Sequence, residues 1–255
     1  VHLKLKMYRG PAGPSLVGTP DCLIGTPEFA RQEPMSASNT LTEVLRAVRL
    51  HGSVQFCLMP SGCWRIDAGV SMQKMGLLPG RAMPFHIVTD GTCWLRMDGR
   101  TTTLMAGDII AFPFATGHEL GAGKNGQSLS PAADLPPQPW TRIPVLHYGE
   151  RPPGVRILCG YLVCKALNFS PLRASLPALL RARSTDKDAE WLHATVKEIE
   201  REVDCGGLGS TSILERLTEA MFIQLVRRHI DTQDGASVGW LAALSDPLVG
   251  RSLAL

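Results

Sequence analysis

The stretch between residues 84 and 120 constrains the fold most tightly, because its apolar residues come in short runs separated by turn signals. A turn at Asp98-Gly99 separates two of these runs, and a third, at residues 109–112, follows Gly107-Asp108. Short apolar runs between Gly, Pro and Asp are typical of strands in a sandwich or barrel. The pattern therefore predicts a mainly β fold built around these central strands.

The flanking segments extend this prediction to a barrel at residues 38–168. Alternation of apolar residues at 53–59 and 155–163 predicts two further strands. The proline-rich stretch from 121 to 153 is expected to be an irregular and mostly disordered insertion. Residues 1–37, which lack an apolar period, are expected to be a disordered extension. It is either upstream or cloning-derived sequence or a genuine unstructured tail.

Composition narrows the functional class. The chain of 255 residues is long enough for a barrel with a helical appendage. Its net charge is +3 and its 26 Lys and Arg residues are scattered, which gives no sign of a nucleic-acid surface. No apolar run is long enough to span a bilayer, and no signal-peptide pattern is seen. The seven cysteines are odd in number and widely spaced, which predicts reduced thiols in a cytoplasmic protein.

Two amphipathic helices are predicted within residues 169–235. The first carries an apolar stripe with helical spacing, and Cys205-Gly206-Gly207 ends it. The second, at about residues 212–230, has an apolar side made of Leu214, Leu217, Met221 and Leu225. The pair forms an antiparallel hairpin that either covers the barrel or forms the interface of a homodimer. The wide apolar side of the second helix favours these four residues as dimerisation candidates.

The order and spacing of several motifs carry a family resemblance. They include Pro84-Phe85-His86, Gly107-Asp108, Pro113 followed by His118, and a C-terminal Gly239-Trp240-Leu241 that precedes Asp246-Pro247. Over roughly residues 38–255, this set resembles the cupin-type regulatory domain of AraC-family transcriptional regulators. The resemblance implies a double-stranded β-helix barrel followed by the helical hairpin.

The same resemblance implies what the domain does. It is expected to sense a small-molecule effector and to dimerise, and not to be an enzyme. In this family the Asp-Pro helix begins a domain with two helix-turn-helix units. Residues 236–255 are therefore expected to be a linker and the truncated start of a DNA-binding domain. Promoter DNA would be bound only through that missing half.

A metal site is the main alternative use of the barrel interior. Metal-binding cupins usually place His-x-His and Glu in their first motif, and the matching positions here, near Leu77, Pro79 and Pro84, hold none of these. His86 shares the inward face of its strand, His118 matches the second-motif His, and Cys159 lies on a later strand. Two imidazoles and a thiolate would suit Zn²⁺.

The alternative to metal binding is that these three residues pack in the core or line a pocket without a metal, since His and Cys are often buried in cores. The candidates for lining a ligand pocket share an aromatic or imidazole ring near the same motifs: His86, Trp94, Phe112, His118 and Tyr161. No catalytic residues are expected. A metal-dependent cupin isomerase or dioxygenase, and a cupin binding protein without a DNA-binding partner domain, remain the two competing functions.

Overall fold

The computed structural model describes residues 50–76, 82–150, 152–163, 175–186 and 189–232. The chain divides into two compact units, Val1–Pro34 and Met35–Leu255, and every described residue belongs to the second. The expected N-terminal extension, 1–37, and the expected linker and truncated DNA-binding start, 236–255, both lie outside the described residues. No helix in the described part is long and apolar enough to cross a membrane.

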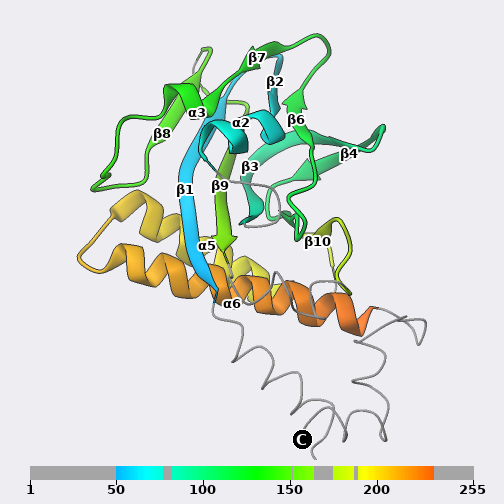
Figure 1. The fold of residues 1–255 in the computed structure, drawn as a ribbon, viewed down its shortest axis with the longest axis vertical. Coiled ribbons are helices and arrows are strands. Elements are labelled where there is room, and N and C mark those ends of the chain that lie inside the picture. Colours follow the sequence, from blue (N-terminus) through cyan, green and yellow to red (C-terminus); the bar gives the residue numbers. More distant parts are fainter. Residues whose placement is uncertain (1–49, 77–81, 151, 164–174, 187–188, 233–255) are drawn as a thin grey trace, which may run out of the picture. The chain divides into compact units, whose positions relative to one another are not determined.

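The described part is mainly β, with a curled sheet above two long helices (Figure 1). Ten strands pair into one sheet, whose main path runs β7-β2-β6-β3-β9-β1-β8, with β4 and β5 paired to β3 and β10 paired to β5. The strands are β1 (His51–Pro60), β2 (Trp64–Asp67), β3 (Ala82–Met97), β4 (Arg100–Met105), β5 (Ile109–Ala111), β6 (Glu119–Ala122), β7 (Gln127–Leu129), β8 (Val145–Tyr148), β9 (Val155–Val163) and β10 (Leu180–Ala182). The helices are α2 (Ala68–Lys74), α3 (Pro131–Asp134), α5 (Glu190–Cys205) and α6 (Ser210–Asp231). The predicted mainly β fold with a helical appendage is confirmed.

Strand β3 produces the curl because its two halves pair with different partners. Its first half pairs with β5 and β9, and its second half pairs with β4 and β6. Between the halves the register with β9 shifts at Val88/Asp90, as in a β-bulge, which bends and twists a strand. Gly91 follows the shift with φ 71°, and a Cβ there would lie 2.2 Å from the Gly154 carbonyl oxygen. Glycine is therefore required at the point where the strand turns from one side of the barrel to the other.

Residues 121–150 contain β7, α3 and β8, contrary to the expected disorder. Strand β7 pairs in parallel with β2, and β8 pairs in parallel with β1. The Tyr148 hydroxyl also donates to Asp134 at 2.6 Å, which ties β8 to α3. The prediction of disorder was wrong because these short strands are stabilised by backbone pairing with distant strands. Such pairing produces little hydrophobic pattern in the local sequence.

The helical hairpin covers the barrel and is continuous with its core. Helix α5 ends where Gly206 adopts the left-handed conformation, φ 51°, as the Gly-Gly signal predicts. In α6, Leu214, Met221 and Leu225 are each 2% exposed or less and share one apolar cluster with residues of β1 and β9. Leu217 is partly buried against the same cluster. Leu214, Met221 and Leu225 are thus covered by their own chain, and Leu217 is covered in part.

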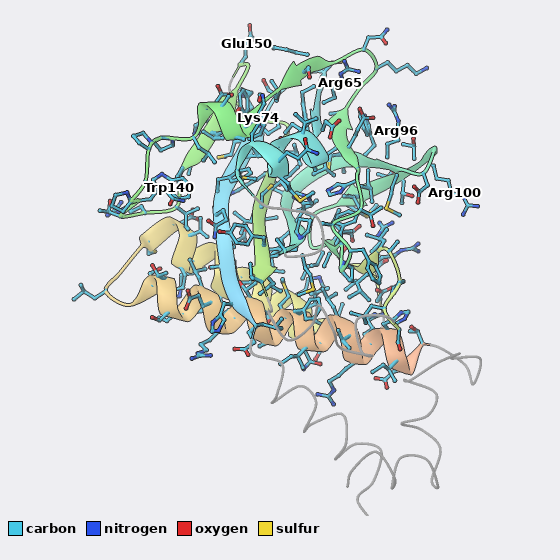
Figure 2. All side chains as sticks on the ribbon, viewed as in Figure 1. Arg65, Lys74, Arg96, Arg100, Trp140 and Glu150 are labelled. Atoms are coloured by element: carbon cyan, nitrogen blue, oxygen red, sulfur yellow. The ribbon has the colours of Figure 1, made fainter. Side chains whose placement is uncertain are left out.

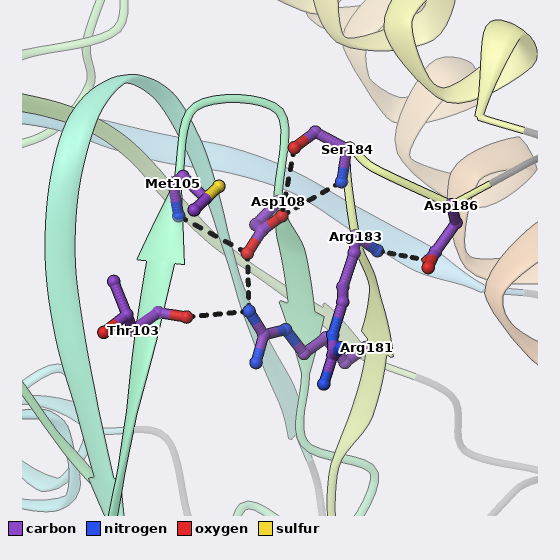
Figure 3. Close-up of polar contacts among 7 residues, drawn as sticks. All are labelled: Thr103, Met105, Asp108, Arg181, Arg183, Ser184 and Asp186. Carbon is purple, nitrogen blue, oxygen red and sulfur yellow. Dashed lines mark hydrogen bonds and ion pairs between the residues drawn. The ribbon is translucent and has the colours of Figure 1, made fainter.

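The buried carboxylate of Asp108, just before β5, connects β10 and the residues that follow it to the barrel (Figure 3). Asp108, 1% exposed, accepts hydrogen bonds from the Arg181 guanidinium at 2.7 Å and from the Ser184 backbone N–H at 3.0 Å. The Arg181 guanidinium also donates to the Thr103 carbonyl oxygen at 2.8 Å. Asp186, two residues after Ser184, forms an ion pair with Arg228 of α6 at 2.9 Å. A polar chain therefore runs from the barrel to the last turn of α6.

Candidate functional site

Three polar side chains predicted to converge do meet inside the barrel. His86 lies on β3 directly opposite Cys159 of β9, and His118 lies just before β6. The Nδ1 atom of His86 is 3.1 Å from Cys159 Sγ, and its Nε2 atom is 2.9 Å from His118 Nε2. The three residues are between 3% and 7% exposed. Alternation on β3 places His86 inward, and the cross-strand register then fixes which residue of β9 faces it.

The carbonyl oxygen of Thr116 determines where the protons of this cluster lie. It is 2.8 Å from His118 Nδ1, so that nitrogen carries the hydrogen and donates it to the carbonyl. A neutral His118 then accepts at Nε2, so His86 donates from its own Nε2. His86 is left accepting at Nδ1, where the Cys159 thiol donates. The cluster is thus a one-directional relay from Cys159 through His86 and His118 to Thr116.

Burial keeps all three groups uncharged at neutral pH, as the relay requires. Desolvation lowers the pKa of His118 from 6.5 to about 4, although the Thr116 carbonyl and the charge of Asp67 oppose the change. Burial, followed by the neighbouring His118, lowers the pKa of His86 well below its usual value. Burial raises the pKa of the Cys159 thiol well above its usual value.

Aromatic packing holds the relay in place from one side. The Phe112 ring stacks on the His118 imidazole, with ring centroids 3.6 Å apart and planes 10° from parallel. The same ring meets His86 edge-on at 6.2 Å. Phe112 is fully buried, so both imidazoles sit against a wall that excludes water.

A cavity of about 40 Å³ opens beside the relay, between the inner face of the sheet and helix α2. His86, Cys159 and Tyr161 line it, whereas Phe112 and His118 are not among its lining residues. Of the predicted pocket residues, His86 and Tyr161 line this cavity, and Phe112 and His118 do not.

Trp94 is the clearest error among the pocket candidates. Cys93 and Leu95 point inward, so Trp94 lies on the outer face of β3. There its indole N–H donates to the Gly123 carbonyl at 3.1 Å, and the Arg96 guanidinium lies 4.7 Å above its ring. The alternation of Cys93 and Leu95 was the signal that could have excluded Trp94.

Helix α2 supplies lining residues that the sequence analysis missed. Met72 and Met75 face the cavity, as does Gln55 from β1. The helix begins at Asp67, whose carboxylate accepts from the Val70 N–H at 3.0 Å in an N-cap. An Asp before an apolar residue three positions on was the available signal for this short helix.

Comparison with known proteins assigns the family. Residues 39–231 match a family model described as "Cupin". The chain belongs to the cupin family. This cupin is 27% identical over 217 residues to an uncharacterised HTH-type transcriptional regulator of Haemophilus influenzae, covering 84% of this chain and 66% of that protein. It is 25% identical over 223 residues to a putative AraC-like transcription regulator of Streptomyces lividans, again covering 84% and 66%. The chain therefore spans about two thirds of the length of these relatives.

Two solved structures are also similar to this cupin. The crystal structure of ToxT from Vibrio cholerae O395 matches with a TM-score of 0.33 and 8% identity, over 78% of this chain and 61% of that one. Wild-type ToxT of Vibrio cholerae strain SCE256, bound to an unsaturated fatty acid, matches with a TM-score of 0.35 and 9% identity, over 78% and 58%. The predicted kinship with cupin domains of AraC-like regulators is confirmed by the family and the curated relatives.

The relay does not fit the zinc centre that the cupin fold suggested. His86 directs its two ring nitrogens, on opposite sides of the imidazole, at two different partners, so one ion cannot replace both contacts. Within the described ranges, no group of three or more His, Cys, Asp and Glu side chains is arranged to hold a metal ion.

Proposed function

We propose that this cupin domain senses a small-molecule effector for an AraC-like transcriptional regulator. The observation that carries the proposal is the cavity beside His86. The polar ring of His86 in its wall is already hydrogen-bonded to Cys159 and His118. Both ring nitrogens of His86 are engaged and uncharged, so the wall offers no acid, base or nucleophile poised for catalysis. The named relatives support a regulatory role over a catalytic one.

The chemistry of the cavity limits the effector to a compact and mostly apolar molecule. Its walls are chiefly aliphatic and aromatic, and Gln55 and Tyr161 supply polar groups at its edge. A volume of about 40 Å³ holds roughly three water molecules, at about 10–15 Å³ each. Effector entry therefore requires Met72 of α2 and Met75, which follows it, to move outward. Methionine side chains suit that movement because they are unbranched and adapt to irregular shapes.

The first experiment blocks the cavity from the α2 side. Met72→Trp fills the cavity, whereas Val70→Trp adds the same ring to the solvent-facing side of the same helix, where Val70 is 47% exposed. Benzyl alcohol, indole and hexanol are tested by thermal shift and calorimetry. Compounds that stabilise the parent and Val70→Trp should fail with Met72→Trp. Equal binding by all three proteins places the effector site elsewhere.

In the proposed regulator, promoter DNA is bound by a region other than the cupin domain. Sequence-specific readout requires a helix in the major groove with side chains that reach base edges. The 255-residue chain should show only weak binding that is lost with added salt, as phosphate contacts are. A regulator with the length of the curated relatives should bind one promoter site specifically. Salt-resistant, sequence-specific binding by this chain alone would contradict the proposal that another region of the regulator binds the DNA.

The remaining parts of the proposal are a homodimer and a cytoplasmic location. Because the apolar face of α6 is used within the chain, a dimer would need another surface. Sedimentation of the chain at graded concentrations tests the homodimer.

A further inference from the structure

A second cavity, distinct from the one beside His86, lies between β10 and the last turns of α6. Its volume is about 330 Å³, within the range of about 300–1,000 Å³ typical of ligand pockets. Three of the residues that line it are arginines, namely Arg181, Arg183 and Arg228. Guanidinium groups supplied by two separate elements make this cavity a candidate site for an anion.

The periodicity of the two elements places these arginines around one space. Arg181 lies on β10 and Arg183 follows the end of that strand, two positions on, so the pair shares one side of the chain. On α6, Leu225, Arg228 and His229 are three and four positions apart, which puts them on one face of the helix. All five residues line the cavity, so the basic side of the β10 segment meets the basic face of α6.

The charges of this lining are not balanced within the described part of the chain. The Asp186 carboxylate also lines the cavity, but it pairs with Arg228 at 2.9 Å and accepts from the Arg183 backbone N–H at 2.7 Å (Figure 3). Arg181 pairs with Asp108, which is not a lining residue. The guanidinium of Arg183 is exposed and has no carboxylate partner among the described residues. The cavity therefore carries one uncompensated positive charge beside two guanidinium groups that are already paired.

We propose that this cavity binds a phosphate group through the guanidinium of Arg183, with Arg181 and Arg228 beside it. The planar fork of a guanidinium matches two phosphate oxygens at once. A phosphomonoester carries about −1.5 to −2 charge near pH 7 and has three acceptor oxygens. A carboxylate has one charge and two oxygens, so a lining with three arginines favours phosphate. Leu179 and Leu225 in the same lining offer apolar contact to an organic substituent.

This site goes beyond the proposed effector cavity, because the two cavities share no lining residue. A bound phosphate would connect the β10 segment to α6, next to the connection that Asp186 already makes with Arg228. The phosphate group could be free or part of a small organic phosphomonoester, and the experiment separates these two sources.

The test is calorimetric titration of the 255-residue chain with inorganic phosphate, phenyl phosphate and benzoate. Salt is kept at about 0.15 M, which screens exposed charges more than about 8 Å apart. Arg183→Gln removes the unpaired guanidinium. The matched control, Arg227→Gln, removes an exposed arginine from the same end of α6 that does not line the cavity. A second control, Arg100→Gln, removes an exposed arginine from β4, away from the hairpin (Figure 2).

We expect the parent and both controls to bind the phosphates equally well. Arg183→Gln should bind them about tenfold or more weakly, because it loses a charge-assisted hydrogen bond. Tighter binding of phenyl phosphate than of inorganic phosphate would support an organic phosphomonoester, and equal binding would support free phosphate. Circular dichroism should show that all three variants remain folded, since each replaces an exposed side chain.

Three results would overturn the proposal. The first is an equal loss of affinity in Arg183→Gln and the controls, which would mean that only net charge attracts the anion. The second is binding of benzoate as tight as that of phenyl phosphate, which would exclude phosphate as the preferred group. The third is no binding of either phosphate. None of these results bears on the effector cavity, because its test uses uncharged ligands and α2 variants.

Discussion

The guanidinium of Arg181 lies 2.7 Å from the carboxylate of Asp108, a partner 73 residues earlier in the chain. This contact links β10 to the turn before β5, and the Asp108 carboxylate accepts further hydrogen bonds from backbone and side-chain groups of Ser184 (Figure 3). Because Asp108 is 1% exposed, the pair is shielded from solvent and from screening by salt.

Asp108→Ala should destabilise the domain by about 3–5 kcal/mol, because it leaves the partly buried Arg181 charge without its partner. Urea unfolding followed by circular dichroism measures the change. Glu119→Ala is the matched control, since its ion pair with Arg96 is solvent-exposed and should contribute no more than about 1 kcal/mol. Similar losses in the two variants would mean that the Asp108 contacts are not a structural tie.

Stability should fall as the pH drops through the range in which the unfolded histidines take up protons. The folded-state pKa of His118 is lowered to about 4, so below its ordinary value of 6.5 protons bind preferentially to the unfolded chain. Its contribution to stability is fully present above pH 6.5 and is lost as the pH falls toward 4. Because burial lowers the pKa of His86 too, the slope should be steeper than one histidine alone would give.

Urea unfolding at pH 7.5, 6.0 and 5.0 measures this slope, and His118→Gln should reduce it by about half. Carbon-13 shifts of the His86 and His118 rings should stay at their neutral positions down to about pH 5. Protonation of either ring near pH 6.5 would contradict the uncharged relay.

Gly121→Ala should destabilise the barrel by about 1–3 kcal/mol or more, through overpacking. A Cβ at this position of β6 would lie 2.2 Å from the Trp94 ring and 2.5 Å from the Trp64 carbonyl oxygen. The control is Gly117→Ala, four residues earlier, where nothing lies within 4 Å of the added atom. Thermal unfolding compares the two variants. Equal melting temperatures would show that Trp94 moves aside at little cost.

Met221→Ala should cost about 2–5 kcal/mol of folding free energy, because the side chain is 1% exposed within the core. Ile213→Ala, on the same helix but 41% exposed, should change stability by no more than about 0.5 kcal/mol. Unfolding is followed at several protein concentrations. If Met221→Ala shifts a dissociation equilibrium and leaves the stability of the monomer unchanged, α6 is an interface after all.

Sequence patterns predicted the parts of the fold that depend on local periodicity. Alternation on β3 and β9 placed His86 and Cys159 inward, and the helical stripe of α5, which includes Leu192 and Ile199, is buried as expected. The stripe on α6 showed which residues would be buried but not what would bury them, because a periodic pattern is the same for a barrel cover and for a dimer interface.

Long-range pairing could not be predicted in the same way. The contact of Asp108 with Arg181 depends on β10 reaching β5, and β7 and β8 are held by strands far away in the sequence. The direction of the hydrogen-bond relay depends on the Thr116 carbonyl, a backbone group that no side-chain pattern reports.

Helix α6 meets a cavity of about 350 Å³ at its first turn and the polar chain from Asp108 near its last. With 22 residues at about 1.5 Å each, it is roughly 33 Å long. Ser210 and Thr211 line the cavity at its first turn, and Arg228 pairs with Asp186 near its last. A tilt of about 5° around the first turn moves the far end by roughly 3 Å, about the length of a hydrogen bond. The helix therefore connects the two places rigidly, so that any displacement of its first turn reaches the Arg228–Asp186 ion pair.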